Sequence, residues 1–230
     1  MTKVSAQELE DWRERLSEWQ EPERFVAAVE QLRRLLGITQ YFTDPRVGFA
    51  LDAWVGARLA SITEASEVRL GVPPWPDYEE RFSRSSKVEF EITEADIEGR
   101  RRGDEYKTVS EGWRFVSIED LIAKAEQAPA ALAKAAKAKA EKGYPRSARL
   151  VINLNIADHE IRQKEIEAAM HDATAVAKSA FSEVWVLWKA KLYRLWKDAA
   201  QNSLIVNTRC DDDLSAEELE QIRRFMRKGA

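Results

Sequence analysis

Cysteine and histidine are scarce in this chain of 230 residues, which has one cysteine and two histidines. A single cysteine excludes an internal disulfide framework and any structural zinc site built from cysteine pairs, and it is typical of a reducing compartment. His159 and His171 are separated by twelve positions, which places them about 120° apart around a helix. They therefore do not form a zinc-binding pair.

Long apolar runs are also absent. No stretch approaches the roughly 18 apolar residues that a membrane span needs, and the first residues, MTKVSAQELEDW, do not resemble a signal peptide. We therefore expect a cytoplasmic protein without a membrane partner. The sequence also has no glycine-rich phosphate loop, no Gly-x-Ser-x-Gly elbow and no dinucleotide fingerprint.

The composition is that of a folded globular protein, with 44% hydrophobic and 33% charged residues. The net charge is −4, but the charge is unevenly distributed. Residues 99–150 contain twelve Lys or Arg and seven Asp or Glu, a local charge of +5, which leaves −9 for the rest. A local basic surface suits a partner that carries phosphates.

Three helices are expected before residue 64. Ser5 and Glu8 form a capping box, Pro22 suits the first turn of a second helix that ends at Gly37, and Asp44 precedes a third. We expect residues 1–43 to form an N-terminal helical hairpin packed on a core domain of residues 44–230. An amphipathic helix pair must bury its apolar stripe, so the hairpin also offers a surface for a homodimer.

The rest of the chain alternates between strand-like and helical patterns. Strands are expected at 67–72, 77–82, 87–94, 149–156, 183–188, 191–196 and 202–208. Helices are expected from Ser117 through Ile122, again from Pro129 to about residue 142, and at 158–180. This order predicts an α/β (α+β) fold with a mixed β-sheet flanked by helices.

Three acidic residues stand out around the first predicted hairpin. Asp77 begins one strand, and Glu89 and Glu91 share one face of the next. If Asp77 pairs near Glu91, the carboxylates lie close together, and a divalent cation would relieve their repulsion. Oxygen ligands of this kind suit Mg²⁺ or Mn²⁺. The simpler interpretation is an acidic strand face in contact with solvent.

This layout resembles the restriction-endonuclease-like PD-(D/E)XK nucleases. The resemblance rests on Pro76-Asp77 at the start of one strand, Glu89-x-Glu91 on the next, and an αβββαβ order over about residues 45–156. It implies Asp77 and Glu91 as metal ligands, or Glu89 as the second choice. If Glu89 is the ligand, Glu91 takes the place of the motif lysine. If Glu91 is the ligand, Thr93 takes that place.

The motif lysine itself is missing from the predicted third strand, and Lys87 or Lys107 could replace it. After that strand come Arg100, Arg101 and Arg102, which with Lys107 could hold a nucleic-acid backbone. Four lysines on an alanine-rich helix could extend this surface, although a solvated helix face explains them better. They are Lys134, Lys137, Lys139 and Lys142.

The leading functional hypothesis is a metal-dependent nuclease that hydrolyses phosphodiester bonds in DNA or RNA, with DNA the favoured partner. The alternative is a catalytically inactive module of the same fold that binds nucleic acid or protein. A third hypothesis is an interaction protein built on the N-terminal helices.

Overall fold

The computed structural model describes residues 3–100, 117–156 and 162–207. Its helices are α1 (Ala6–Ser17), α2 (Pro22–Thr43), α3 (Gly48–Ala60), α5 (Ile118–Ala125), α6 (Ala128–Ala140) and α7 (Gln163–Thr174), with 3₁₀ turns at Pro45–Val47 and Ala175–Ser179. Its strands are β1 (Glu67–Leu70), β2 (Tyr78–Ser83), β3 (Ser86–Ala95), β4 (Arg149–Leu154), β5 (Glu183–Trp188), β6 (Lys191–Lys197) and β7 (Ala200–Asn207).

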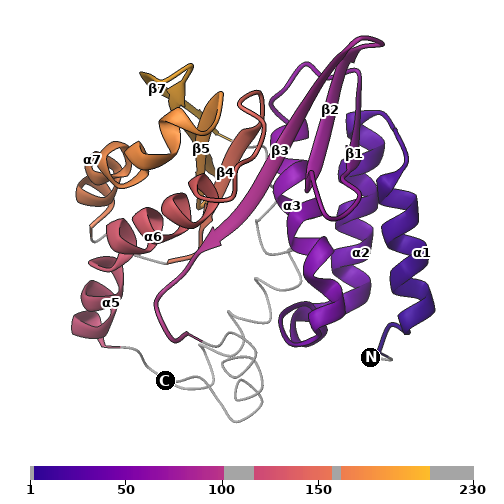
Figure 1. Cartoon of the computed structure of the whole chain (residues 1–230). Coiled ribbons are helices and arrows are strands. Elements are labelled where there is room, and N and C mark those ends of the chain that lie inside the picture. The colour runs from indigo at the N-terminus through magenta and orange to yellow at the C-terminus, as the bar shows by residue number, and fades with distance from the viewer. Residues whose placement is uncertain (1–2, 101–116, 157–161, 208–230) are drawn as a thin grey trace.

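The described strands form one seven-stranded sheet in the order β1 to β7. The two pairs β3–β4 and β4–β5 are parallel, and the other neighbouring strands are antiparallel. The predicted mixed sheet flanked by helices is confirmed, with α1–α3 on one side and α5–α7 on the other (Figure 1). No helix in these ranges is both long and apolar enough to cross a membrane.

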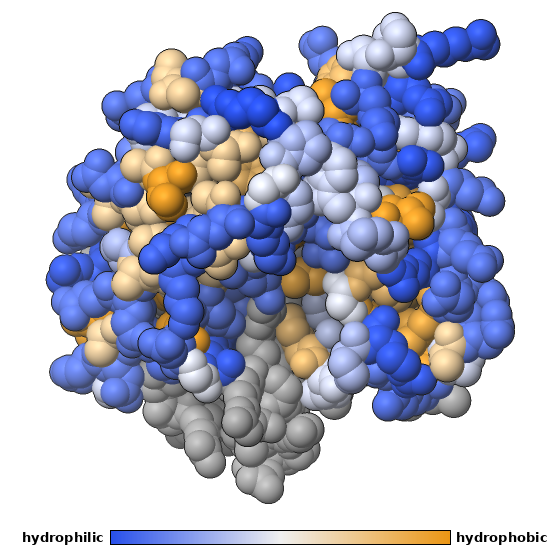
Figure 2. Space-filling model, viewed as in Figure 1, coloured by the Kyte–Doolittle hydropathy of each residue, from blue (hydrophilic) through white to orange (hydrophobic). Residues whose placement is uncertain are grey.

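Two hydrophobic cores lie on the two faces of the sheet. Alternate residues of β4 divide between them: Val151 packs with the α1–α3 side, whereas Leu150 and Ile152 pack with the α5–α7 side. Outside these cores, hydrophilic residues cover most of the face shown in Figure 2, and apolar residues appear only in separate small areas.

The N-terminal helices share the core of the first face. Leu9 and Leu16 of α1 and Phe25 of α2 are buried in the same cluster as Val68 of β1. Gln20, between α1 and α2, also pairs with Val68 through two backbone hydrogen bonds of 2.8 and 3.1 Å. This bridge covers the outer edge of β1.

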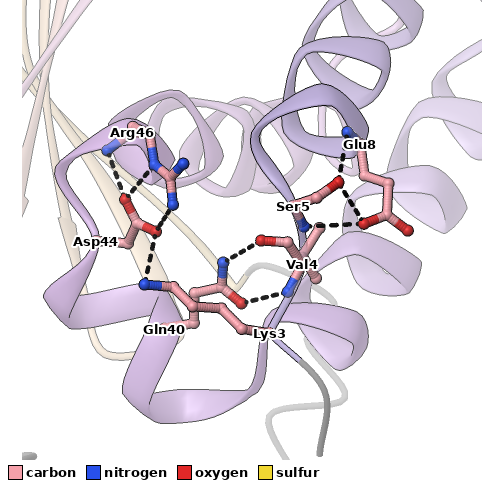
Figure 3. Close-up of polar contacts among 7 residues, drawn as sticks. All are labelled: Lys3, Val4, Ser5, Glu8, Gln40, Asp44 and Arg46. Atoms are coloured by element: carbon pink, nitrogen blue, oxygen red, sulfur yellow. Dashed lines mark hydrogen bonds and ion pairs between the residues drawn. The ribbon is translucent and has the colours of Figure 1, made fainter.

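Local side-chain bonds hold the start of α1 in place (Figure 3). Ser5 and Glu8 form the predicted capping box. The amide of Gln40 bonds both the N–H and the carbonyl of Val4 at 2.9 Å. Asp44 accepts from Arg46 and pairs with Lys3, and the hydrogen bond from Arg46 holds the pKa of Asp44 well below its usual range.

Gly37, the predicted end of the second helix, has a φ of 62° and a non-helical backbone, so the helix is broken there, and α2 continues beyond the break to Thr43. Another predicted helix differs from the observed one. The helix predicted to extend to residue 180 ends as α-helix at Thr174 and continues as a 3₁₀ turn. The Thr174 hydroxyl donates to the carbonyl of Met170 and accepts from the indole of Trp196, so tertiary contacts occupy this turn.

Gly71 allows a close backbone approach beside β2. A Cβ at this position would lie 1.7 Å from the carbonyl oxygen of Pro76, and the Gly71 N–H donates to the carbonyl of Asp77 at 2.8 Å. We expect Gly71→Ala to lower the free energy of unfolding by about 1–3 kcal/mol or more, because the backbone must move. Urea unfolding measures this change.

Gly48→Ala is the matched control, because a Cβ there would meet nothing within 4 Å. It should be neutral or slightly stabilising, since alanine is the better helix former. Equal stability of the Gly71 and Gly48 variants would contradict the packing argument.

Candidate functional site

The backbone of Asp77 is bonded on both sides. Its N–H donates to the carbonyl of Phe90 at 3.0 Å, and its carbonyl accepts from Gly71 at 2.8 Å. The register of β2 and β3 ends at Tyr78 and Phe90, directly before Asp77, and the charge of Glu91 raises the pKa of Asp77, so the two carboxylates lie near one another. The Asp77 carboxylate also accepts from the N–H of Ile92 at 2.8 Å, which limits its rotation.

Glu91 lies in the middle of β3, on the face covered by α6, and is only 3% exposed. Its carboxylate forms an ion pair with Lys139 of α6. Burial and the nearby Glu91 carboxylate raise the pKa of Tyr144. The Glu91 carboxylate is therefore held by Lys139, with the Tyr144 hydroxyl close by.

Lys139 corrects the interpretation of the alanine-rich helix. Its side chain is 15% exposed, whereas those of Lys134 and Lys137 are about 70% exposed (70% and 68%) and pair with acidic residues near the surface. The solvated interpretation therefore fails for Lys139. A signal was present in the sequence, since Lys139 follows the buried Leu132 and Ala136 by seven and three positions, on one face of the helix.

Asp52 is an acidic residue of the site that the sequence did not point to. It projects from α3 and lines a pocket together with Asp77. Burial, together with the negative charges of Asp77, Glu91 and Glu94, raises its pKa to about 8, although Lys139 opposes this shift. Burial and the charge of Glu91 likewise raise the pKa of Asp77 to about 6.

These shifts show that burial, and next to it the neighbouring carboxylates, disfavour the ionised forms of both aspartates. Lys139 and Lys142 lower the pKa of Asp77, but burial and Glu91 outweigh them. Carboxylates in such a state are candidates for functional chemistry, because a cation or a proton would relieve their repulsion.

Glu89 and Thr93 share the strand face of Glu91 but occupy other surroundings. Glu89 pairs in register with Glu79, and Lys87 bridges the two carboxylates at 2.7 Å each. Lys87 is thus bound near the hairpin turn, away from Asp77. Thr93, two residues beyond Glu91, is half-buried.

Of the predicted basic loop, only Arg100 is described. Its guanidinium pairs with Asp96 at 3.0 Å and donates to the carbonyl of Asn155 at 2.7 Å. These bonds tie the end of β3 to the segment after β4. Arg101, Arg102 and Lys107 lie outside the described residues.

Within residues 3–100, 117–156 and 162–207, no three side chains of His, Cys, Asp or Glu form a group that could hold a metal ion. Asp77 and Glu91 are close enough for the charge of Glu91 to raise the pKa of Asp77.

No protein-family model, no curated protein and no solved structure matches this chain.

The raised pKa of Asp52 predicts a pH-dependent effect of its removal. The folded protein holds this proton up to about pH 8, whereas an unfolded chain releases it near pH 4. Stability conferred by the proton is therefore full below about pH 4 and is lost as the pH rises toward 8. We expect Asp52→Asn to melt a few degrees above the wild type at pH 8.5, with little difference at pH 4.

Thermal unfolding at both pH values, with exposed Asp11→Asn as control, tests this expectation. A melting difference of the same size at both pH values would contradict it.

Proposed function

We propose that this chain is a metal-dependent nuclease of the PD-(D/E)XK kind that hydrolyses phosphodiester bonds in nucleic acid. The observation that carries the proposal is the convergence of Asp77, Glu91 and Lys139 from a loop, a strand and a helix. The element order α3–β1–β2–β3–α6–β4, with β4 parallel to β3, supports it, because this is the αβββαβ order that the resemblance implies.

The donor set fits a hard divalent cation. Asp77 and Glu91 offer carboxylate oxygens, and Mg²⁺ is commonly bound through only one or two carboxylates with water and substrate phosphate completing its shell. Burial and the charge of Glu91 raise the pKa of Asp77, so they disfavour its ionised form, which a bound cation would stabilise. A bound Mg²⁺ or Mn²⁺ would supply Lewis acidity toward a phosphoryl oxygen and a more acidic water.

Lys139 takes the role of the lysine that Thr93 replaces on the strand. Its ammonium group has three donors, and one of them serves Glu91. The others can donate to a phosphate oxygen placed beside the carboxylates, where negative charge builds during hydrolysis. Lys139 is the described lysine that contacts Glu91 directly, which makes it a better candidate than Lys87.

Asp52 lines the same pocket as Asp77 and has no counterpart in the short motif. Its position in the pocket with Asp77 makes it a supporting residue for the same cation. Arg101, Arg102 and Lys107 remain predicted contacts to the nucleic-acid backbone. Arg100 has a bonded structural position.

A catalytically inactive module of the same fold is the second candidate. The ion pair of Lys139 with Glu91 favours it, because a lysine that already neutralises the acid reduces the need for a metal. This candidate binds nucleic acid or protein without turnover.

The first test replaces Asp77 with asparagine, which keeps an acceptor for Ile92 and removes the charge. We expect Mn²⁺-dependent cleavage of plasmid and single-stranded DNA to fall at least about 100-fold, and calorimetric Mn²⁺ binding to weaken. The Ser86→Ala variant at the hairpin turn is the control and should cleave like the wild type. A fully active Asp77→Asn protein would rule the assignment out.

The second test separates Lys139 from the metal ligands. We expect Lys139→Met to lower cleavage about 100-fold while Mn²⁺ binding persists or strengthens, because the lysine no longer competes for Glu91. Lys137→Met, an exposed neighbour on the same helix, should leave both unchanged. A folded wild type that neither binds Mn²⁺ nor cleaves would favour the inactive module.

A further inference from the structure

A pocket opens beside Asp77, between the N-terminal helices and the loop from β1 to β2. Asp52 and Asp77 form its acidic part, and Leu70, Phe49 and three prolines form an apolar wall. The remaining charged residue of its lining is Arg13 of α1. The pocket thus combines two carboxylates, an apolar wall and one guanidinium.

Arg13 occupies an unusual place for an arginine. It lies four positions after the buried Leu9 and three before the buried Leu16, on the face of α1 that packs against the protein. It is half-buried as a result. The bonds of Val4 to Gln40 anchor the start of α1 (Figure 3), so the helix that carries Arg13 is held in position.

The guanidinium of Arg13 has no ion-pair or hydrogen-bond partner in the described part of the chain. Other arginines nearby are engaged: Arg15 stacks on Trp12, and Arg69 pairs with Glu79. The positive charges that oppose the raised pKa of Asp77 come from Lys139 and Lys142. The described residues therefore leave the charge of Arg13 unpaired, so it can bind an anionic ligand.

We propose that Arg13 binds one phosphate of a nucleic-acid strand while the next phosphodiester of the same strand lies at Asp77. The inference rests on the proposed nuclease function and extends it to substrate binding. A guanidinium presents several N–H donors in a plane and suits phosphate oxygens. The wall of Phe49 and prolines contacts the sugar and base next to that phosphate, where flat apolar surfaces favour stacking.

This placement gives the N-terminal hairpin a role in substrate binding. Arg13 and Asp77 line the same pocket, one from α1 and the other from the loop before β2. A strand that contacts both is oriented relative to Glu91 and Lys139. Arg13 is a substrate-binding residue and takes no part in the chemical step.

The test measures binding apart from cleavage. The full chain is titrated into a fluorescein-labelled single-stranded oligonucleotide in EDTA, and anisotropy is followed at several salt concentrations. We expect Arg13→Ala to weaken binding about tenfold, as for the loss of one charge-assisted contact. The slope of log K against log salt should become shallower by about 0.7, the value for one phosphate contact on a single strand.

Arg15→Ala, on the exposed side of the same helix, is the matched control and should bind like the wild type. Arg13→Lys should restore the salt slope and part of the affinity, which a purely structural role would not predict. Circular dichroism of each variant checks that the fold is kept.

The outcomes separate the two proposals. Unchanged binding and salt slope in Arg13→Ala, with wild-type cleavage intact, would overturn the role of Arg13 and leave the nuclease assignment standing. If Arg13→Ala lowers the affinity and the salt slope but the wild type never cleaves with Mn²⁺, the phosphate contact is supported and the catalytic assignment is overturned. Binding of thymidine monophosphate without binding of the oligonucleotide would overturn the assignment of a strand.

Discussion

The pairing of β2 with β3 is the constraint on which the site depends. The backbone bonds of Asp77 to Phe90 and Gly71 set its position along β3, and the bond from Ile92 directs its carboxylate. A shift of one residue would turn every side chain of β3 to the opposite face. Glu91 would then leave α6 and enter the apolar core with α1–α3. The register therefore decides at once which residues form the core and which carboxylates meet.

The second constraint is electrostatic. Asp52, Asp77 and Glu91 lie in surroundings where burial and mutual repulsion raise the pKa of the two aspartates. The ion pair with Lys139 offsets part of this unfavourable electrostatic energy in the folded protein. A cation would relieve the repulsion that remains in such a cluster, and an incomplete balance of charge of this kind is common at functional sites. The same balance explains why Lys139 matters both to the stability of Glu91 and to its proposed chemistry.

Much of the fold was predictable from local patterns. Alternation in residues 87–94, the turn-forming serines before them, and the apolar run of β4 identify the strands that surround the site. The capping box at Ser5 was correct because it depends on residues only three apart. The end of α7 was not predictable, because the buried contacts of Thr174 with Trp196 involve a strand far along the chain. Local pattern alone does not reveal which distant side chain a helix end will meet.

The candidate site was also predictable from the sequence only in part. Asp77 and Glu91 were identified from sequence because a hairpin brings together residues that are near one another in the chain, and strand alternation fixes the face on which they lie. Lys139, Asp52 and Arg13 come from helices separated from that hairpin by many residues. The spacing of Lys139 from Leu132 and Ala136 places it on the apolar face of its helix, but local pattern does not show which strand that face meets. The sequence by itself determined the strands, the hairpin and the acidic pair. Only the tertiary structure decided which helix faces turn inward, because helix packing depends on how apolar surfaces from the whole chain are buried together.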